Sequence, residues 1–446
     1  MRPARPLMIA LAAALVFALG AALTGPPPAR SQTGADVLLN VIGGGAKKLN
    51  IFVPEFTVSG ASADPQGLGK RLAEVTGADL TFSAVFSVVG GAPPLPADDA
   101  EATKKAWTDA AAAGAHTALH GLLALRGDRA ELEMRLYNLT SPDLALIASK
   151  KFEVPVAEAR RLAHKTADEI VLQFTGEPGV ADTRIAFVSA RARAKELILM
   201  DYDGNAPSAL TSNQSINLSP AWSPDARSLA FTSYMRGYPY LYRLFAFEQR
   251  PVQLLAGYLG INSSPAWSPD GRSVALTLSK DGNPEIYLLT LATGAFRRLT
   301  THPGIDTEPT WAPTGRQIAF VSDRAGPPQI FIMDAEGANV RRLTQSGFNT
   351  QPRWSPKGDT IAYTSRQGLH DLWAVSPDGS NLRQLTSGSG DNESASWAPN
   401  GRHLVFHSSR LRGSALFTML ADGSEQKPLP RSEGQATSPA WSPRLP

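Results

Sequence analysis

Apolar and polar positions alternate in two different ways along the chain, and the pattern changes at about residue 183. Upstream, apolar residues at helical spacing predict helices over residues 66–77, 99–114 and 156–176, the last ending at Gly176 as a C-cap. Short apolar runs before and between them predict strands over residues 49–56, 119–125, 131–139 and 145–154. This alternation predicts a small α/β domain over residues 36–176.

Downstream, a tryptophan phrase recurs at a nearly constant spacing, and PAWSPDGRSVAL at residues 265–276 is one copy. Each period holds this phrase and three further short apolar strands. Several short strands in a period of this length are typical of a β-propeller blade. The S-P-D-G sequence fits a tight turn, and tryptophan offers a large buried area between neighbouring blades. The phrase tryptophans are Trp222, Trp267, Trp311, Trp354, Trp397 and Trp441, which gives a period of 43 to 45 residues.

The repeated parts are offset by one along the chain, and this offset predicts how the propeller closes. The strand IAFVS at residue 185 has no tryptophan phrase before it, and the last phrase, at Trp441, has no strand after it. The C-terminal phrase would therefore complete the blade that begins at Thr183, which removes exposed sheet edges. The predicted fold class is a multi-domain α+β chain, with the α/β domain followed by a six-bladed β-propeller over residues 183–446 that the C-terminal strand closes.

The first 30 residues have the layout of a secretory signal peptide. Arg2 and Arg5 precede an apolar stretch over residues 7–23, and the sequence GPPPARSQTG follows it. Cleavage near Gly20 and cleavage near Ala29 both fit the pattern. No other stretch is long and apolar enough to span a bilayer, so we expect an exported mature protein without a membrane span.

Composition narrows the classes of function. A net charge of +3 with dispersed Lys and Arg argues against nucleic-acid binding. The absence of cysteine excludes disulfides, thiolate metal sites and a cysteine nucleophile, and no G-x-S-x-G motif marks a serine hydrolase. The histidine pairs His116/His120 and His403/His407 have no clear third ligand. We therefore expect no enzyme, no cofactor and no metal site.

Several specific segments resemble the periplasmic TolB family of the Tol–Pal cell-envelope system. They are residues 160–189, 201–204, 219–225, 264–272, 281–287, 305–311 and 438–443. The resemblance covers nearly the whole mature chain. It implies a non-enzymatic, monomeric adaptor in the periplasm that supports outer-membrane integrity and cell division. In the family, the propeller binds the peptidoglycan-associated lipoprotein Pal, and the N-terminal segment binds the inner-membrane protein TolA.

The resemblance also places the partner-binding residues. The family architecture makes P-x-W the innermost strand of each blade, so the loop before it lies at one mouth of the central channel. Family contacts carry over to Ile261, Ser264 and Thr307, although the family often has a polar or imidazole residue at the first position. The full predicted set at the mouth is Asn217, Ser219, Ile261, Asn262, Ser263, Ser264, Asp306, Thr307, Glu308, Asn349, Thr350, Gln351, Asn392, Glu393 and Thr437.

For TolA, the predicted contact is the strand-like segment before Gly43, which could add to the edge of a partner's sheet. Its residues are Asp36, Val37, Leu38, Leu39, Asn40 and Val41. The alternative is that this segment forms the first strand of the α/β domain. An alternative function is a propeller that binds a saccharide or another small ligand in its channel. The mouth loops contain Phe348 as their single aromatic residue, which favours protein contact over sugar stacking.

Overall fold

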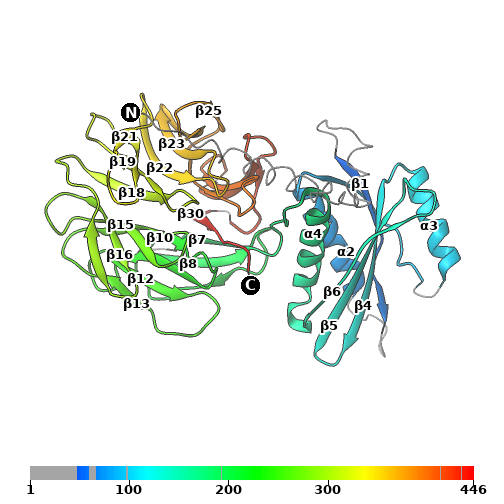
Figure 1. Ribbon diagram of the computed structural model, residues 1–446. Coiled ribbons are helices and arrows are strands. Elements are labelled where there is room, and N and C mark those ends of the chain that lie inside the picture. The colour runs from blue at the N-terminus through cyan, green and yellow to red at the C-terminus, as the bar shows by residue number, and fades with distance from the viewer. Residues whose placement is uncertain are drawn as a thin grey trace, which may run out of the picture.

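The computed structural model describes residues 48–59, 67–96, 99–191, 193–411, 413–432 and 434–445. They form a smaller α/β domain and a larger propeller, which lie side by side (Figure 1). Within these ranges, none of the helices has the length and apolar character needed to cross a membrane. The predicted signal peptide and residues 36–41 lie outside the described ranges.

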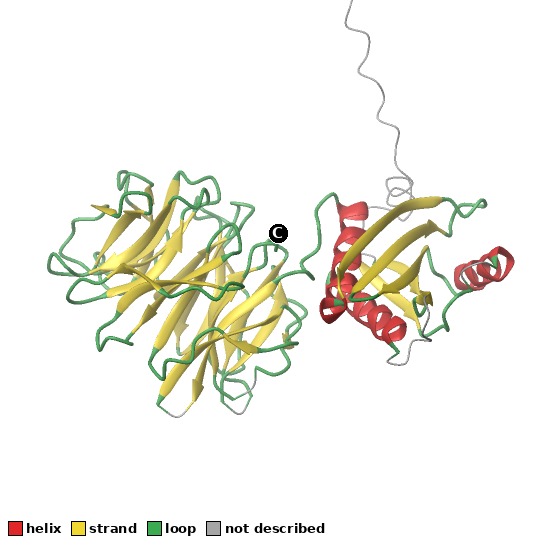
Figure 2. Ribbon diagram, turned by 90° about the horizontal axis from the view of Figure 1, so that it is seen from below, coloured by secondary structure: helices red, strands yellow, loops and turns green. Residues whose placement is uncertain are grey.

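The small domain has a mixed sheet in the order β3-β1-β4-β5-β6, with β2 also paired to β4. Strand β1 runs parallel to β3 and β4, and β4, β5 and β6 are antiparallel. Helices α2 and α4 cover one face, between the sheet and the propeller, and α3 covers the other (Figure 2). The elements are β1(Leu49–Val53), β2(Thr57–Ser59), α2(Leu68–Phe82), β3(Phe86–Gly90), α3(Ala100–Ala112), β4(Thr117–Arg126), β5(Arg129–Asn138), β6(Leu146–Pro155), the 3-10 turn η1(Val156–Glu158) and α4(Arg160–Thr175).

All the predicted helices and strands of this domain are present. Helix α2 is longer than predicted, and strands β2 and β3 were not predicted. Helix α2 continues to Phe82, beyond the predicted end at residue 77. Strand β3 begins after a turn of three residues. Ala84 takes the left-handed conformation in this turn, with φ 60°, where glycine is usual, so the sequence carries no glycine or proline that would mark the turn. The end of α4 is as predicted, since Gly176 has φ 74° and its N–H donates to the Leu172 carbonyl.

The propeller has six four-stranded antiparallel sheets, and the C-terminal strand closes the ring as predicted. The blades, each from its innermost strand outward, are blade 1, β30(Ala436–Trp441), β7(Arg184–Arg191), β8(Ala194–Asp201) and β9(Ser208–Ala209); blade 2, β10(Asn217–Trp222), β11(Ser228–Ser233), β12(Tyr240–Phe245) and β13(Gln253–Ala256); blade 3, β14(Asn262–Trp267), β15(Ser273–Leu278), β16(Glu285–Thr290) and β17(Ala295–Arg298); blade 4, β18(Asp306–Trp311), β19(Gln317–Ser322), β20(Gln329–Asp334) and β21(Arg341–Arg342); blade 5, β22(Phe348–Trp354), β23(Ile361–Gln367), β24(Leu369–Val375) and β25(Arg383–Gln384); and blade 6, β26(Asn392–Trp397), β27(His403–Ser408), β28(Ala415–Leu420) and β29(Lys427–Pro428).

The phrase tryptophans join each blade to the one before it. Four of the six indole N–H groups donate to a main-chain carbonyl on the innermost strand of the preceding blade. The bonds are Trp222 to Ala440 (3.0 Å), Trp267 to Ala221 (3.1 Å), Trp311 to Ala266 (3.1 Å) and Trp397 to Arg353 (2.9 Å). Trp354 donates to Gly358 and Trp441 to the Thr183 hydroxyl instead. A buried indole thus contributes both contact area and a satisfied hydrogen bond.

Every innermost strand also carries a β-bulge at the same position. The pairing register shifts just before the tryptophan in all six blades. The residue three places before each tryptophan has a positive φ of 48–55°, although none is glycine. Such a conformation is costly, and a bulge redirects the side chain that occupies it. The six residues are Ser219, Ser264, Glu308, Gln351, Ser394 and Ser438.

The two domains meet through a buried polar cluster on the inner faces of α2 and α4. The His164 Nδ1 lies 2.7 Å from the Asp79 carboxylate, which also accepts a 2.5 Å bond from the Tyr202 hydroxyl of blade 1. Beside this cluster, the Phe82 ring stacks on His403 with centroids 4.5 Å apart, and the His403 Nε2 lies 2.9 Å from the Phe82 carbonyl. The junction is therefore built from specific polar contacts as well as apolar packing.

The carboxylates around His164 favour its charged form at this junction. Burial alone would lower the pKa of His164, but Asp79, Asp201 and Asp203 act in the opposite direction and raise it to about 10. Burial raises the pKa of Asp79, although His164 and Tyr202 act against that change. The paired imidazolium therefore stabilises the folded state across neutral pH.

We expect His164→Gln to lower the free energy of unfolding in a pH-dependent way. The stabilisation from the His164 proton is complete below the ordinary pKa of 6.5 and is lost as the pH rises through about 10. The difference between wild type and variant should therefore be largest near pH 6 and shrink steadily toward pH 10. Urea unfolding at a series of pH values measures it, and a difference that stays constant over this range would contradict the assignment.

We expect Trp267→Ala to lower the free energy of unfolding by about 3 to 5 kcal/mol, because it leaves a cavity between blades 2 and 3 and frees the Ala221 carbonyl. The control is Leu259→Ala, whose side chain is 77% exposed, and we expect a change within about 0.5 kcal/mol. Chemical denaturation measures both. A similar loss in the two variants would rule out a special role for the interblade indole.

Candidate partner-binding site

The predicted site residues lie at one end of the propeller. In each blade the innermost strand begins where the second strand ends, as the pairing of Asn217 with Ser233 shows. The loops before the innermost strands and the turns between the second and third strands therefore share one face, which we call the mouth face. The small domain contacts the opposite end, at Asn400, Arg402 and His403. Among the described residues, these contacts leave the mouth face clear of the small domain.

Five of the predicted contacts are buried and serve as internal anchors. Asn217 accepts a 2.7 Å bond from the Ser233 hydroxyl and donates to the Lys195 carbonyl, while Asp306 pairs with Arg324 at 2.7 Å. Fully buried polar groups of this kind join the mouth loops to neighbouring strands, and they cannot offer side chains to a partner. We therefore remove them from the proposed contact surface. They are Asn217, Asn262, Asp306, Asn349 and Asn392.

Four further predicted residues line the central channel, because they occupy the bulges of the innermost strands. They are Ser219, Ser264, Glu308 and Gln351. The channel has a volume of about 480 Å³, and the phrase tryptophans and prolines also line it. The two long side chains connect successive blades. A Glu308 carboxylate oxygen accepts the Gln351 main-chain N–H at 2.6 Å, and the Gln351 amide oxygen accepts the Ser394 N–H at 2.9 Å.

The channel also holds opposite charges on two neighbouring blades. Burial raises the pKa of Glu308, while the Gln351 N–H and Arg353 act against that rise. Burial likewise lowers the pKa of Arg353, against the effect of Glu308. The Arg353 guanidinium donates to the Pro352 carbonyl at 2.8 Å. The channel therefore combines opposite charges from two neighbouring blades with a lining of tryptophan and proline side chains.

The remaining six predicted residues are partly or largely exposed at the rim of the mouth face. They are Ile261, Ser263, Thr307, Thr350, Glu393 and Thr437. Ile261 belongs to a set of apolar residues that each precede a buried anchor. This apolar set consists of Ile216, Ile261, Ile305 and Phe348, which are 36–46% exposed. These four positions surround the mouth on blades 2 to 5.

The turns between the second and third strands and the loop before β14 add more exposed apolar residues to the same face, and the sequence pattern did not predict them. Among the described residues, ten of the seventeen large exposed hydrophobic side chains lie at this end. Besides the four of the apolar set, they are Tyr234, Tyr238, Tyr258, Leu259, Leu369 and Leu411. Three tyrosines therefore accompany Phe348, so the expectation that Phe348 is the single aromatic residue at the mouth is wrong, and it no longer separates protein contact from sugar stacking. Exposed apolar residues gathered on one face are a mark of protein interaction sites.

The described residues thus form a closed six-bladed β-propeller beside a small α/β domain. Comparison with known proteins gives the family of the chain. Sequence models of the TolB amino-terminal domain and the TolB β-propeller domain match residues 37–143 and 171–445. The chain belongs to the TolB family.

Named relatives agree with this assignment. Proteins named Tol-Pal system protein TolB are 36% identical over 230 residues in Cereibacter sphaeroides and 42% identical over 197 residues in Geobacter sulfurreducens. The chain spans about half the length of these curated relatives, at 51% and 44%. The solved structure of TolB from Acinetobacter baumannii is 29% identical with a TM-score of 0.76, and the match covers 89% of this chain and 97% of that one.

We expect Asp306→Ala to act on stability rather than on surface properties. The change leaves the Arg324 guanidinium without its buried partner, and losing one member of such a pair costs about 3 kcal/mol. The neighbouring rim variant Thr307→Ala should stay within about 0.5 kcal/mol of wild type. Urea denaturation of both variants checks this. Equal stability of Asp306→Ala and wild type would show that Asp306 is not an anchor.

Proposed function

We propose that this protein is a non-enzymatic adaptor of the Tol–Pal system. It works in the periplasm and uses the mouth face of the propeller to bind a peptidoglycan-associated lipoprotein of the Pal type. The observation that carries the proposal is the concentration of exposed apolar side chains on the end of the propeller that the small domain leaves uncovered. Membership of the TolB family supports the choice of partner, because relatives bear the name Tol-Pal system protein.

The form of the mouth face suits a rigid protein partner. Its buried anchors hold the loops from beneath, so the rim residues need little ordering when a partner binds. Ile305 and Phe348 are exposed on adjacent blades, and each lies two residues before a partly exposed threonine, Thr307 or Thr350. Exposed apolar side chains interspersed with small polar groups are typical of protein interfaces.

The N-terminal segment at residues 36–41 is proposed as the TolA contact. It lies outside the described residues, and family membership alone supports this part of the proposal. The signal-peptide pattern of the first 30 residues supports a periplasmic location. An adaptor with two such contacts would connect the inner membrane to the outer membrane and the peptidoglycan, and would support envelope integrity and cell division.

The test is an equilibrium titration of the mature protein with the periplasmic domain of the Pal-type lipoprotein from the same genome. We expect saturable binding that Ile305→Asp combined with Phe348→Asp weakens by at least about 100-fold, since charges would be buried against apolar partner surface. The matched control is Phe247→Asp combined with Leu382→Asp, which places the same charges on exposed apolar positions outside the mouth face. The control should bind like wild type.

The alternative ligand class is tested in parallel with soluble peptidoglycan fragments and simple saccharides. Binding of a saccharide that Glu308→Gln abolishes, without any lipoprotein binding, would favour the small-ligand function in the channel. Lipoprotein binding that the control variant loses as much as the mouth variant would overturn the assignment of the mouth face. Circular dichroism of each variant confirms that the fold is intact.

A further inference from the structure

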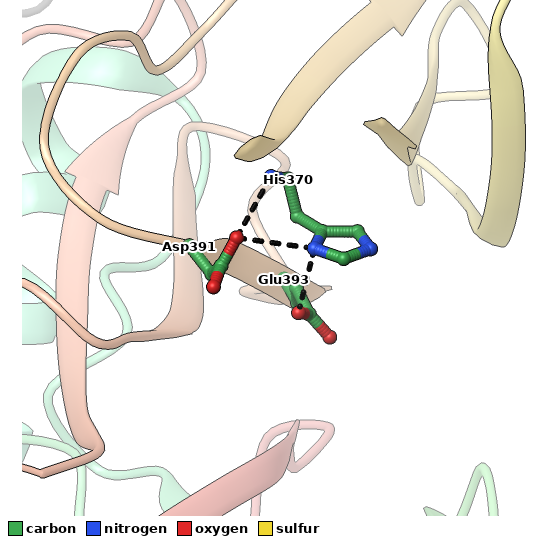
Figure 3. A group of neighbouring side chains, drawn as sticks. All are labelled: His370, Asp391 and Glu393. Carbon is green, nitrogen blue, oxygen red and sulfur yellow. Dashed lines mark hydrogen bonds and ion pairs between the residues drawn. The ribbon is translucent and has the colours of Figure 1, made fainter. Parts of the chain in front are cut away.

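Three potential metal-ligand side chains converge at the mouth face, outside the apolar set. The His370 Nδ1 lies 3.1 Å from an Asp391 carboxylate oxygen and 3.4 Å from a Glu393 carboxylate oxygen (Figure 3). All three ligand atoms lie within 4.8 Å of one another, and the three residues are partly exposed. Within the described part of the chain, this is the one group of three such residues that approach so closely.

Two neighbouring blades supply the three side chains. His370 is the second residue of β24 in blade 5, while Asp391 precedes β26 of blade 6 and Glu393 lies within it. The main chain holds the first two in place. The Asp391 oxygen that faces the imidazole also accepts the His370 main-chain N–H at 2.9 Å, and the Asp391 N–H donates to the Ser409 hydroxyl at 2.8 Å. The backbone therefore orients the carboxylate without help from a bound ion.

The spacing of the ligand atoms agrees with the coordination of zinc. Zinc binds imidazole nitrogen and carboxylate oxygen at about 2.0–2.2 Å in tetrahedral geometry, which separates neighbouring ligand atoms by about 3.3–3.6 Å. The distances from the His370 Nδ1 to the two carboxylate oxygens, 3.1 and 3.4 Å, lie close to this range. One imidazole with two carboxylates suits a first-row transition metal, whereas calcium and magnesium prefer oxygen ligands throughout.

A second histidine provides independent support. His407 lies directly opposite Glu393 in the β26–β27 ladder, so both side chains are on the same face of the sheet. Its Nδ1 is buried and has no hydrogen-bond partner among the described residues. A buried nitrogen without a partner is costly and calls for an explanation such as an unoccupied ligand role. His407 is not one of the three converging ligands, so its role would be to orient Glu393 toward the ion.

We propose that His370, Asp391 and Glu393, with His407 beside them, form a binding site for a zinc-like divalent cation. The site joins blades 5 and 6 at the rim of the mouth face. A bound dication would neutralise the two carboxylates and tie β24 to the start of β26, which stabilises the joint between the blades. Because the three ligands are partly exposed, a coordination position stays open to water or to a donor group from outside. This inference does not rest on the proposed partner.

The test uses the mature chain without an affinity tag, freed of metal with a chelator and titrated with ZnCl₂ by calorimetry. We expect one saturable equivalent of zinc and an increase in the melting temperature when zinc is present. His370→Ala and Glu393→Gln should each weaken binding by at least about 10-fold and remove the thermal shift. The control is Asp281→Asn, an exposed carboxylate outside the group, which should bind zinc like wild type.

Three outcomes would overturn the proposal. They are the absence of saturable zinc binding by the folded wild type, equal zinc affinity in wild type and His370→Ala, and equal loss of binding in the Asp281→Asn control. A parallel CaCl₂ titration serves the same purpose, because a site that binds calcium more tightly than zinc contradicts the assigned ligand chemistry. No lipoprotein is present in these titrations, so their failure would leave the adaptor proposal unaffected.

Discussion

The closed ring depends on the contact between each innermost strand and the blade before it. In four blades the indole N–H of the phrase tryptophan bonds a carbonyl of the preceding innermost strand, as Trp267 does with Ala221. A left-handed bulge residue lies three places before the tryptophan in all six blades. Blades 4 to 6 add two bonds, in which the Gln351 N–H donates to the Glu308 carboxylate and the Ser394 N–H donates to the Gln351 amide oxygen. The channel wall is therefore a connected polar and aromatic framework.

The surface available for binding follows from that framework. The polar groups of anchors such as Asn217 and Asp306 are bonded to other residues of the mouth loops and turns. Their apolar neighbours Ile216 and Ile305 are exposed on the surface. The alternation of buried polar and exposed apolar residues inverts the usual pattern of a soluble surface. This inversion makes the mouth face the strongest candidate for partner binding on the propeller. It also separates this face from the opposite end, where His403 contacts the small domain.

Much of the fold could be predicted from the chain, whereas the assignment of individual site residues could not. The period of the tryptophans and the unmatched strand at residue 185 sufficed to predict six blades and the closing strand. The mouth loops were also located correctly at one end of the propeller. Within the loop of blade 4, however, Ile305, Asp306 and Thr307 are adjacent in sequence, and the burial of Asp306 goes with its pairing to Arg324 in the turn between β19 and β20. Such pairing leaves no signal in the local pattern.

The sequence by itself determined the architecture, because tryptophan spacing, turn residues and strand alternation are local properties that repeat along the chain. The tertiary structure alone decided which side chains share a surface. It brought Tyr238 and Leu411 to the same face as Phe348, although they lie on different blades. It also placed His370 beside Asp391 across a blade boundary, at 21 positions of separation. Contacts between neighbouring blades depend on how the closed ring packs, and the residue pattern within one repeat carries no information about them.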